Sequence, residues 1–237
     1  MISFTPVRQS DDILELHLAG LAAQPFADSW FYDDNDEPSP LLADRQVFPT
    51  IDDLPPRGSY ERGEVDHDWP TTAVARIAAI KNSALGTFLA SPYEWIFLID
   101  SDVLIPPGLI EHLLEIRTPI VSAVYWTDWG DGPHPNVWDY HPYKVAGRWE
   151  KYREPGDYIV GGLGACTLLH RSVVEVGVNF NPVRGITFAG EDRHFCIRAS
   201  AADIPLIACS HFDVFHIYHD HQLEEARRWT SQLLPAI

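Results

Sequence analysis

An acidic triplet after an apolar run is the part of the sequence best suited to metal chemistry. Asp100, Ser101 and Asp102 follow residues 95–99, which read Trp-Ile-Phe-Leu-Ile. Such a short run is typical of a strand buried on both faces, and ligands bind at the carboxyl ends of strands in open α/β sheets. Two carboxylates around one residue can share a Mg²⁺ or Mn²⁺ ion, although Asp and Ser are also common in turns and helix caps. The preceding strand favours the metal site.

A second pair of acids stands at the start of a predicted helix. Glu191 and Asp192 follow Gly190, and residues 195–202 place apolar side chains at helical spacing. Acids at a helix N-terminus complement the helix dipole, which by itself accounts for the pair. The alternative is that one carboxylate acts as a general base at the rim of a pocket.

Glycines and histidines mark two further candidate segments. Three of the four residues 161–164 are glycine, which allows either close approach to a ligand or a bulge or tight turn. Neither the Walker spacing nor GxGxxG is present. Residues 211–221 are dense in histidine, and an imidazole there could complete a Mn²⁺ site. The chain has no HExxH motif, so a zincin peptidase is not supported.

Trp126 and Trp129 begin an aromatic stretch that is also rich in glycine and proline. Flat apolar rings suit stacking on the face of a sugar, or a protein interface. Ordinary core packing explains part of this stretch equally well.

Apolar spacing predicts alternating strands and helices through the first half of the chain. Strands are expected at residues 2–7, 29–32, 95–99 and 120–126, and helices at 11–18, 73–89 and 109–116. The strand, helix and strand over 95–126 predict a βαβ unit with a right-handed crossover. Residues 36–70 are acidic and carry several prolines, so we expect an irregular excursion there and no long helix.

Length and composition indicate one globular domain. The chain has 237 residues, 46% of them hydrophobic and 22% charged, and a net charge of −17. This charge argues against a protein that grips nucleic acid or anionic lipid over a broad face. No apolar run reaches the ~18–20 residues of a membrane span, and the first residues do not read as a signal peptide. Three cysteines are too few for a disulfide framework or a thiolate zinc site. The expected location is cytoplasmic.

Taken together and in this order, these segments resemble the GT-A class of glycosyltransferases, in particular the family 2-like enzymes that use nucleotide sugars. The resemblance spans most of the chain. Asp100-Ser101-Asp102 is similar to the DxD metal motif of that class, and residues 162–166 followed by Arg171 are similar to its G-x-G-A segment. Glu191-Asp192 resembles its ED helix, and His216 matches a late histidine that completes the metal site in some members.

The resemblance also implies a donor site in the first half of the chain. Its expected members are the end of the first strand, the acids after the second strand and a basic pair on a helix: Thr5, Pro6, Arg8, Asp33, Asp34, Lys81 and Asn82. Lys81 stands where the class often has arginine, and a lysine lacks the bidentate geometry of a guanidinium. The segment 36–70 has no counterpart in the class.

The resemblance implies an α/β fold of the GT-A type, with a mixed, mostly parallel sheet flanked by helices. Residues 1–125 would form a nucleotide-binding half and residues 126–237 an acceptor and catalytic half of a single domain. The implied reaction moves a sugar from a nucleoside-diphosphate sugar to a hydroxyl acceptor, with inversion. The implied roles are Asp192 as base beside Glu191; Asp100, Asp102 and His216 on Mn²⁺ or Mg²⁺; Asp100, Ser101, Gly162 and Gly164 on the donor; and Trp126 and Trp129 on the acceptor.

Two other functions fit parts of the sequence. A nucleotidyltransferase of related fold usually carries a Gly-rich basic loop after its first strand, and residues 5–10 contain no glycine. A non-catalytic sugar-binding protein would use the tryptophans but would not need Asp100, Asp102, Asp192 and His216 together. A nucleic-acid acceptor is not expected for so acidic a chain.

Overall fold

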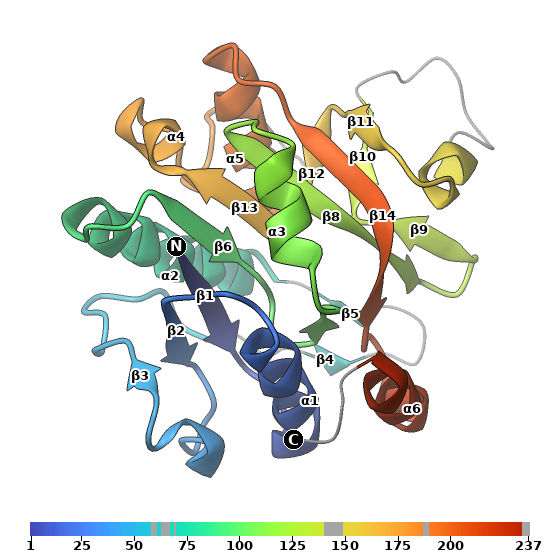
Figure 1. Cartoon of the computed structure of the whole chain (residues 1–237). Coiled ribbons are helices and arrows are strands. Elements are labelled where there is room, and N and C mark those ends of the chain that lie inside the picture. The colour runs from blue at the N-terminus through green and yellow to red at the C-terminus, as the bar shows by residue number, and fades with distance from the viewer. Residues whose placement is uncertain (58–60, 63–66, 69, 140–148, 187–189, 234–237) are drawn as a thin grey trace.

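The computed structural model describes residues 1–57, 61–62, 67–68, 70–139, 149–186 and 190–233 (Figure 1). Its main feature is a ten-stranded sheet with the order β11-β14-β8-β13-β6-β1-β2-β3, in which β7 also pairs with β14 and β9 with β8. The strands are β1 (Ile2–Val7), β2 (Asp28–Asp33), β3 (Gln46–Val47), β6 (Trp95–Leu98), β7 (Val103–Leu104), β8 (Ile120–Asp128), β9 (Pro133–Pro135), β11 (Asp157–Ile159), β13 (Thr167–His170) and β14 (Ile207–His216). Two small sheets pair β4 (Glu61–Arg62) with β5 (His67–Asp68) and β10 (Val137–Trp138) with β12 (Gly162–Leu163).

The sheet is mixed and mostly parallel, as predicted. Strand β1 is parallel to β2 and β6, β2 is parallel to β3, and β8 is parallel to β14. Strands β6 and β8 belong to one sheet but are not neighbours, because β13 lies between them and is antiparallel to both. The predicted strand–helix–strand unit therefore exists with one additional strand inserted.

Helices cover both faces of this sheet (Figure 1). They are α1 (Asp11–Ala22), α2 (Thr71–Ala90), α3 (Leu109–Glu115), α4 (Arg171–Glu175), α5 (Glu191–Ala201) and α6 (Leu223–Leu233), with single 3₁₀ turns η1 (Pro40–Leu42), η2 (Trp149–Arg153) and η3 (Asp220–Gln222). Strand β6 shows why two layers form. Ile96 and Leu98 belong to a core shared with α2 and α5, whereas Phe97 and Ile99 belong to a core shared with α1 and α3.

Residues 36–70 form no long helix in their described part, which confirms the prediction for this segment. They contribute η1, β3, β4 and β5 instead. Residues 58–60, 63–66 and 69 lie outside the described residues.

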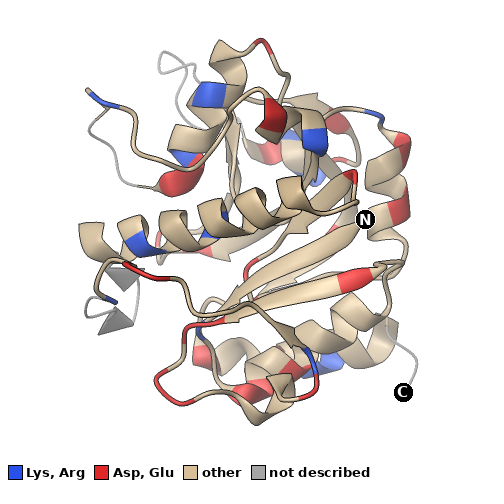
Figure 2. Ribbon diagram, turned by 90° about the vertical axis from the view of Figure 1, so that its left-hand side faces the viewer, with Lys and Arg blue, Asp and Glu red and all other residues tan. Residues whose placement is uncertain are grey.

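Charged residues are spread over the molecule. In Figure 2 the acidic positions lie on helices as well as loops in both its upper and lower parts, and the basic positions form no continuous stripe in this view. Among the described residues, every helix is too short or too polar to cross a lipid bilayer.

Candidate active site

Strand pairing brings His216 to the acidic triplet. The chain leaves β6, passes Asp100 and Asp102, and forms β7, which pairs with the end of β14 so that His216 stands opposite Val103. The amide of Ile217 donates to the carbonyl of Asp102 over 2.9 Å. The His216 Nε2 atom consequently lies 3.6 Å from an Asp102 carboxylate oxygen.

Neighbouring polar groups orient this pair. The Thr127 hydroxyl lies 2.7 Å from Nδ1 of His216, and the Gln9 amide donates to the other Asp102 oxygen over 2.9 Å. Burial alone would raise the pKa of Asp102, but hydrogen bonding and charge interaction with His216 leave that pKa below its ordinary value. Asp102 is therefore held as a carboxylate beside an imidazole.

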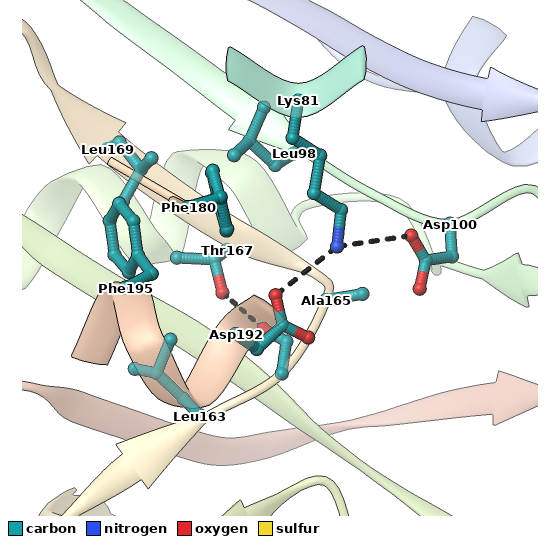
Figure 3. Close-up of a pocket in the computed structure, with 11 residues that line it drawn as sticks. Lys81, Leu98, Asp100, Leu163, Ala165, Thr167, Leu169, Phe180, Asp192 and Phe195 are labelled. Atoms are coloured by element: carbon teal, nitrogen blue, oxygen red, sulfur yellow. Dashed lines mark hydrogen bonds and ion pairs between the residues drawn. The ribbon is translucent and has the colours of Figure 1, made fainter. Parts of the chain in front are cut away.

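Lys81 joins the triplet to the acids of α5. Its Nζ atom lies 3.2 Å from Asp192 and 3.8 Å from Asp100 (Figure 3). The same atom lies 2.8 Å from Glu191. The lysine side chain is 3% exposed. Burial by itself would lower the pKa of Lys81, but the three carboxylates raise it well above its ordinary value, so the ammonium stays charged.

Asp192 titrates in the neutral range in this setting. Burial raises its pKa to about 7, the charges of Glu191 and Asp100 add to the rise, and Lys81 opposes it. The pKa of Asp100 is also raised, chiefly by loss of solvent. A carboxylate with a pKa near 7 can take up and release a proton at neutral pH, which is the property of a general base.

A narrow pocket is lined by Lys81, Asp100 and Asp192 together with apolar side chains (Figure 3). Gly164 lines it, and a Cβ atom at this position would lie 3.6 Å from an Asp192 carboxylate oxygen. Gly162 has a different role, because the indole of Trp138 lies 2.0 Å from the place a Cβ would occupy. Gly162 therefore makes room for Trp138, and Gly164 lies next to Asp192.

The residues predicted at the end of β1 are mostly enclosed. Thr5 is buried and its hydroxyl lies 3.1 Å from Nε2 of His17, whose Nδ1 is 2.8 Å from the Val103 carbonyl. Burial lowers the pKa of His17 to about 4, so this imidazole is neutral and ties β1 to β7. Pro6 is also buried, whereas Arg8 is exposed and donates to the Arg57 carbonyl over 3.4 Å.

Asp33 and Asp34 both have partners within the protein. The Asp33 carboxylate accepts the amides of Asn35 and Ser39 over 3.1 and 2.8 Å. Asp34 is buried and forms an ion pair of 2.6 Å with Arg76 and one of 3.3 Å with Arg57. Sequence analysis did not select Arg57 or Arg76.

The remaining predicted residues have other partners or surroundings. Asn82 accepts the Phe180 amide over 2.8 Å and donates to Asn181 over 2.9 Å, and Ser101 is buried. Trp126 lines a hollow of about 290 Å³ between β8, η2 and β14, and the Arg153 guanidinium lies 3.9 Å from its ring centre. Trp129 is 44% exposed and stacks on His134.

Tyr125 is a site residue that the sequence did not reveal. It lies on β8 with its ring centre 4.9 Å from that of His216. Burial, followed by the charges of Asp100 and Asp102, raises its pKa well above the ordinary value, so the phenol keeps its proton. Tyr125 lies inside an ordinary apolar strand, so the sequence pattern did not indicate that its side chain reaches the site.

The predicted metal ligands form only part of a metal site. They are Asp100, Asp102 and His216. Asp102 and His216 face each other, but Asp100 lies toward Lys81, and the three groups do not bring ligand atoms within 4.8 Å of one another. Among the described residues, only His112, Asp157 and His211 meet that distance. A Mg²⁺ or Mn²⁺ site commonly uses one or two carboxylates and completes its shell with substrate phosphates. Asp102 offers one such carboxylate and His216 an imidazole, which suits Mn²⁺ better than Mg²⁺.

Comparison with solved structures identifies the fold. TarS from S. aureus aligns with a TM-score of 0.54 and 13% identity, over 98% of this chain and 39% of TarS. GalNAc-T7, solved with UDP, GalNAc and Mn²⁺, aligns with a TM-score of 0.53 and 13% identity, over 91% of this chain and 43% of GalNAc-T7. Both are GT-A-type glycosyltransferases. This chain has the GT-A fold.

The structural comparison confirms the GT-A fold that the motifs of the sequence predict. No protein-family model matches the sequence, and a search of curated proteins found no match. The chain spans less than half the length of TarS and GalNAc-T7.

Proposed function

We propose that this protein is a metal-dependent glycosyltransferase that moves a sugar from a nucleoside-diphosphate sugar to an acceptor hydroxyl. The observation that carries the proposal is the Lys81 contact, which unites Asp100 of the triplet with Asp192 of α5 at one edge of a GT-A sheet. These residues are 92 positions apart in the chain (192 − 100), so the fold alone brings them together.

The donor would bind across the carboxyl ends of β1, β6 and β8. Asp102 and His216 would hold Mn²⁺ or Mg²⁺ together with the diphosphate, and Asp100 and Ser101 would lie beside them. When bound, such a cation supplies charge neutralisation of the leaving diphosphate. The Arg57 and Arg76 guanidiniums, gathered around Asp34 near Arg8, are further donor-contact candidates.

Asp192 would act as the general base. The acceptor oxygen attacks the anomeric carbon as the bond to the diphosphate oxygen breaks, and the hydroxyl proton passes to an Asp192 oxygen, with inversion at that carbon. The pKa of about 7 suits this role at neutral pH. Glu191 and Lys81 would position Asp192 and set its charge, and Gly164 leaves the sugar space beside it.

The acceptor would bind on the β8 side. Trp126 lines the hollow of about 290 Å³, and its indole face suits a sugar or another flat apolar group. Trp129 is the second candidate, because it is the more exposed ring.

Thermal shift and donor hydrolysis together test the proposal. The protein is screened against UDP-, GDP-, dTDP- and CMP-sugars with and without Mn²⁺, since a ligand that binds the folded state raises the melting temperature. We expect one donor class to give a Mn²⁺-dependent shift and slow release of nucleoside diphosphate. Asp192→Asn should retain the shift and lose the release. Asp203→Asn, an exposed acid just past α5, is the matched control.

Two outcomes would overturn the proposal, and a third would overturn only the role of Asp192. Pyrophosphate release from a nucleoside triphosphate would indicate a nucleotidyltransferase. Binding of free sugars without turnover of any donor would indicate a non-catalytic sugar-binding protein. Full activity of Asp192→Asn would refute the base assignment.

A further inference from the structure

Three metal-ligating side chains meet away from the proposed donor and base residues, and one of them, His211, also lines the hollow beside Trp126. His112 lies on α3, Asp157 begins the edge strand β11, and His211 lies within β14. Each offers one ligand atom, and these atoms all lie within 4.8 Å of one another. None of the three belongs to the cluster of Asp100, Asp102, Asp192 and His216, so this cluster is a separate centre.

Strand pairing and helix packing build this centre. Asp157 stands opposite Cys209 in the β11–β14 pair, which places its side chain near His211, two residues further along β14. The Asp157 oxygen and His211 Nε2 are 3.6 Å apart. Helix α3 packs over the same face of the sheet, and the rings of His112 and His211 have centres 4.8 Å apart with their planes tilted by 57°. The two rings are therefore in contact without lying parallel, and one ligand atom of each lies within 4.8 Å of the other.

One ring nitrogen of His112 lacks a hydrogen-bond partner. Its Nε2 atom is buried and has no hydrogen-bond partner among the described residues. A buried polar atom without a partner costs about 1–3 kcal/mol, so such atoms usually have a ligand or water. This observation is independent of the ligand clustering and points to a group bound beside His112.

The spacing suits a tetrahedral cation after small side-chain movements. Zn²⁺ binds nitrogen and carboxylate oxygen at about 2.0–2.2 Å, which places neighbouring ligand atoms about 3.4 Å apart. The Asp157–His211 separation of 3.6 Å is already close to this value. Both of these side chains are substantially exposed, at 41% and 34%, and can rotate toward His112.

We propose that His112, Asp157 and His211 bind a divalent cation of the zinc class and thereby fasten α3 to the β11–β14 edge of the sheet. Two imidazoles and one carboxylate favour Zn²⁺ over Mg²⁺, which prefers an all-oxygen shell. Water would fill the fourth position. The cation stabilises the folded state, because the unfolded chain does not hold the three ligands together.

Zinc binding to the metal-free protein tests this proposal. The protein is dialysed against a chelator, and bound Zn²⁺ is then measured by equilibrium dialysis with elemental analysis, alongside the melting temperature. We expect His211→Gln and Asp157→Asn each to remove one equivalent of Zn²⁺ or to raise its Kd by more than about tenfold. Both variants should also lose the zinc-dependent rise in melting temperature.

Two control variants separate this centre from the proposed catalytic one. His216→Gln should leave the equivalent bound at His112, Asp157 and His211 intact, whatever it does to donor binding. His134→Gln, at a histidine paired with Asp131 elsewhere on the chain, should leave the zinc stoichiometry and Kd unchanged. The proposal therefore survives or fails independently of the glycosyltransferase assignment.

Ring-nitrogen NMR provides a readout that does not depend on stability. Stoichiometric Zn²⁺ should shift the imidazole ¹⁵N signals of His112 and His211 together. Unchanged zinc stoichiometry and Kd in His211→Gln and Asp157→Asn would refute the proposal, as would a zinc-induced shift confined to other histidines.

Discussion

Replacing Lys81 by methionine tests how the candidate active site is held together. Methionine keeps the unbranched apolar stem of lysine but removes its ammonium. That ammonium lies within 4 Å of three carboxylates, and among the described residues it is the only cation so close to them. Asp100, Glu191 and Asp192 would then face one another without a counter-ion. The variant should be less stable, and its loss should depend on pH.

The magnitude follows from burial. Removing one partner of a buried ion pair typically costs about 3–5 kcal/mol, because the remaining charge stays desolvated. The pKa of Asp192 is about 7 with Lys81 present, and loss of Lys81 removes the largest interaction that lowers it. In the variant this pKa rises further. A carboxyl group whose folded pKa exceeds its unfolded value contributes stability at low pH that is lost as pH rises through the folded pKa. The penalty of the substitution should therefore be near 3–5 kcal/mol at pH 8 and clearly smaller at pH 5.5.

Urea unfolding at pH 5.5 and 8 measures this difference. Lys151→Met is the matched control, because Lys151 forms a 2.9 Å ion pair with Asp139 and is 41% exposed. Exposed pairs contribute about 0–1 kcal/mol, so the control should change little at either pH. A Lys81→Met penalty below about 1 kcal/mol, or one equal at both pH values, would contradict the electrostatic account of this site.

Three further predictions follow from the same geometry. Asp192→Asn should lower donor turnover by about 10²–10⁴-fold with an unchanged donor Kd, measured by product release and calorimetry. In the wild type, turnover should rise with pH through about 7 and level off above it, because only deprotonated Asp192 accepts a proton; a profile flat from pH 6 to 8 would contradict this. Gly162→Ala should lower the free energy of unfolding by about 1–3 kcal/mol, because the new methyl group meets the Trp138 indole. Gly86→Ala on the exposed face of α2 should instead raise the free energy of unfolding by up to about 1 kcal/mol, because alanine favours the helix.

Individual strands and helices were predictable, because each depends on the spacing of apolar residues within a short stretch of sequence. The strand at 95–99, the helix from about residue 73 and the acids that open α5 all lie where the sequence places them. The insertion of β13 between β6 and β8 was not predictable. Its four residues, Thr167–His170, carry no length or pattern that distinguishes a central strand from a loop, and its partners are distant in the chain.

The kinds of side chain at the site were predictable from the sequence, but the contacts between them were not. The carboxylates of Asp100 and Asp102 follow a buried strand, which is a local signal. The ion pairs of Lys81 and of Arg76 join residues 110 and 42 positions away, and no spacing rule reports such contacts. The same holds for the zinc-class centre, because the histidine-rich segment was visible while His112 and Asp157 were not.

The choice of lysine at position 81 has a physical reason that links fold and function. An ammonium is a compact charge with donors in three directions, and Lys81 uses it to reach carboxylates on two separate segments. A planar guanidinium would favour one carboxylate in a bidentate pair. Three carboxylates against one lysine leave an excess of negative charge at the edge of the sheet, before Asp102 is counted. That excess favours binding of a cation, which would offset the repulsion between these carboxylates and a diphosphate. The acidity of this pocket thus accounts for the expected dependence of donor binding on a divalent metal.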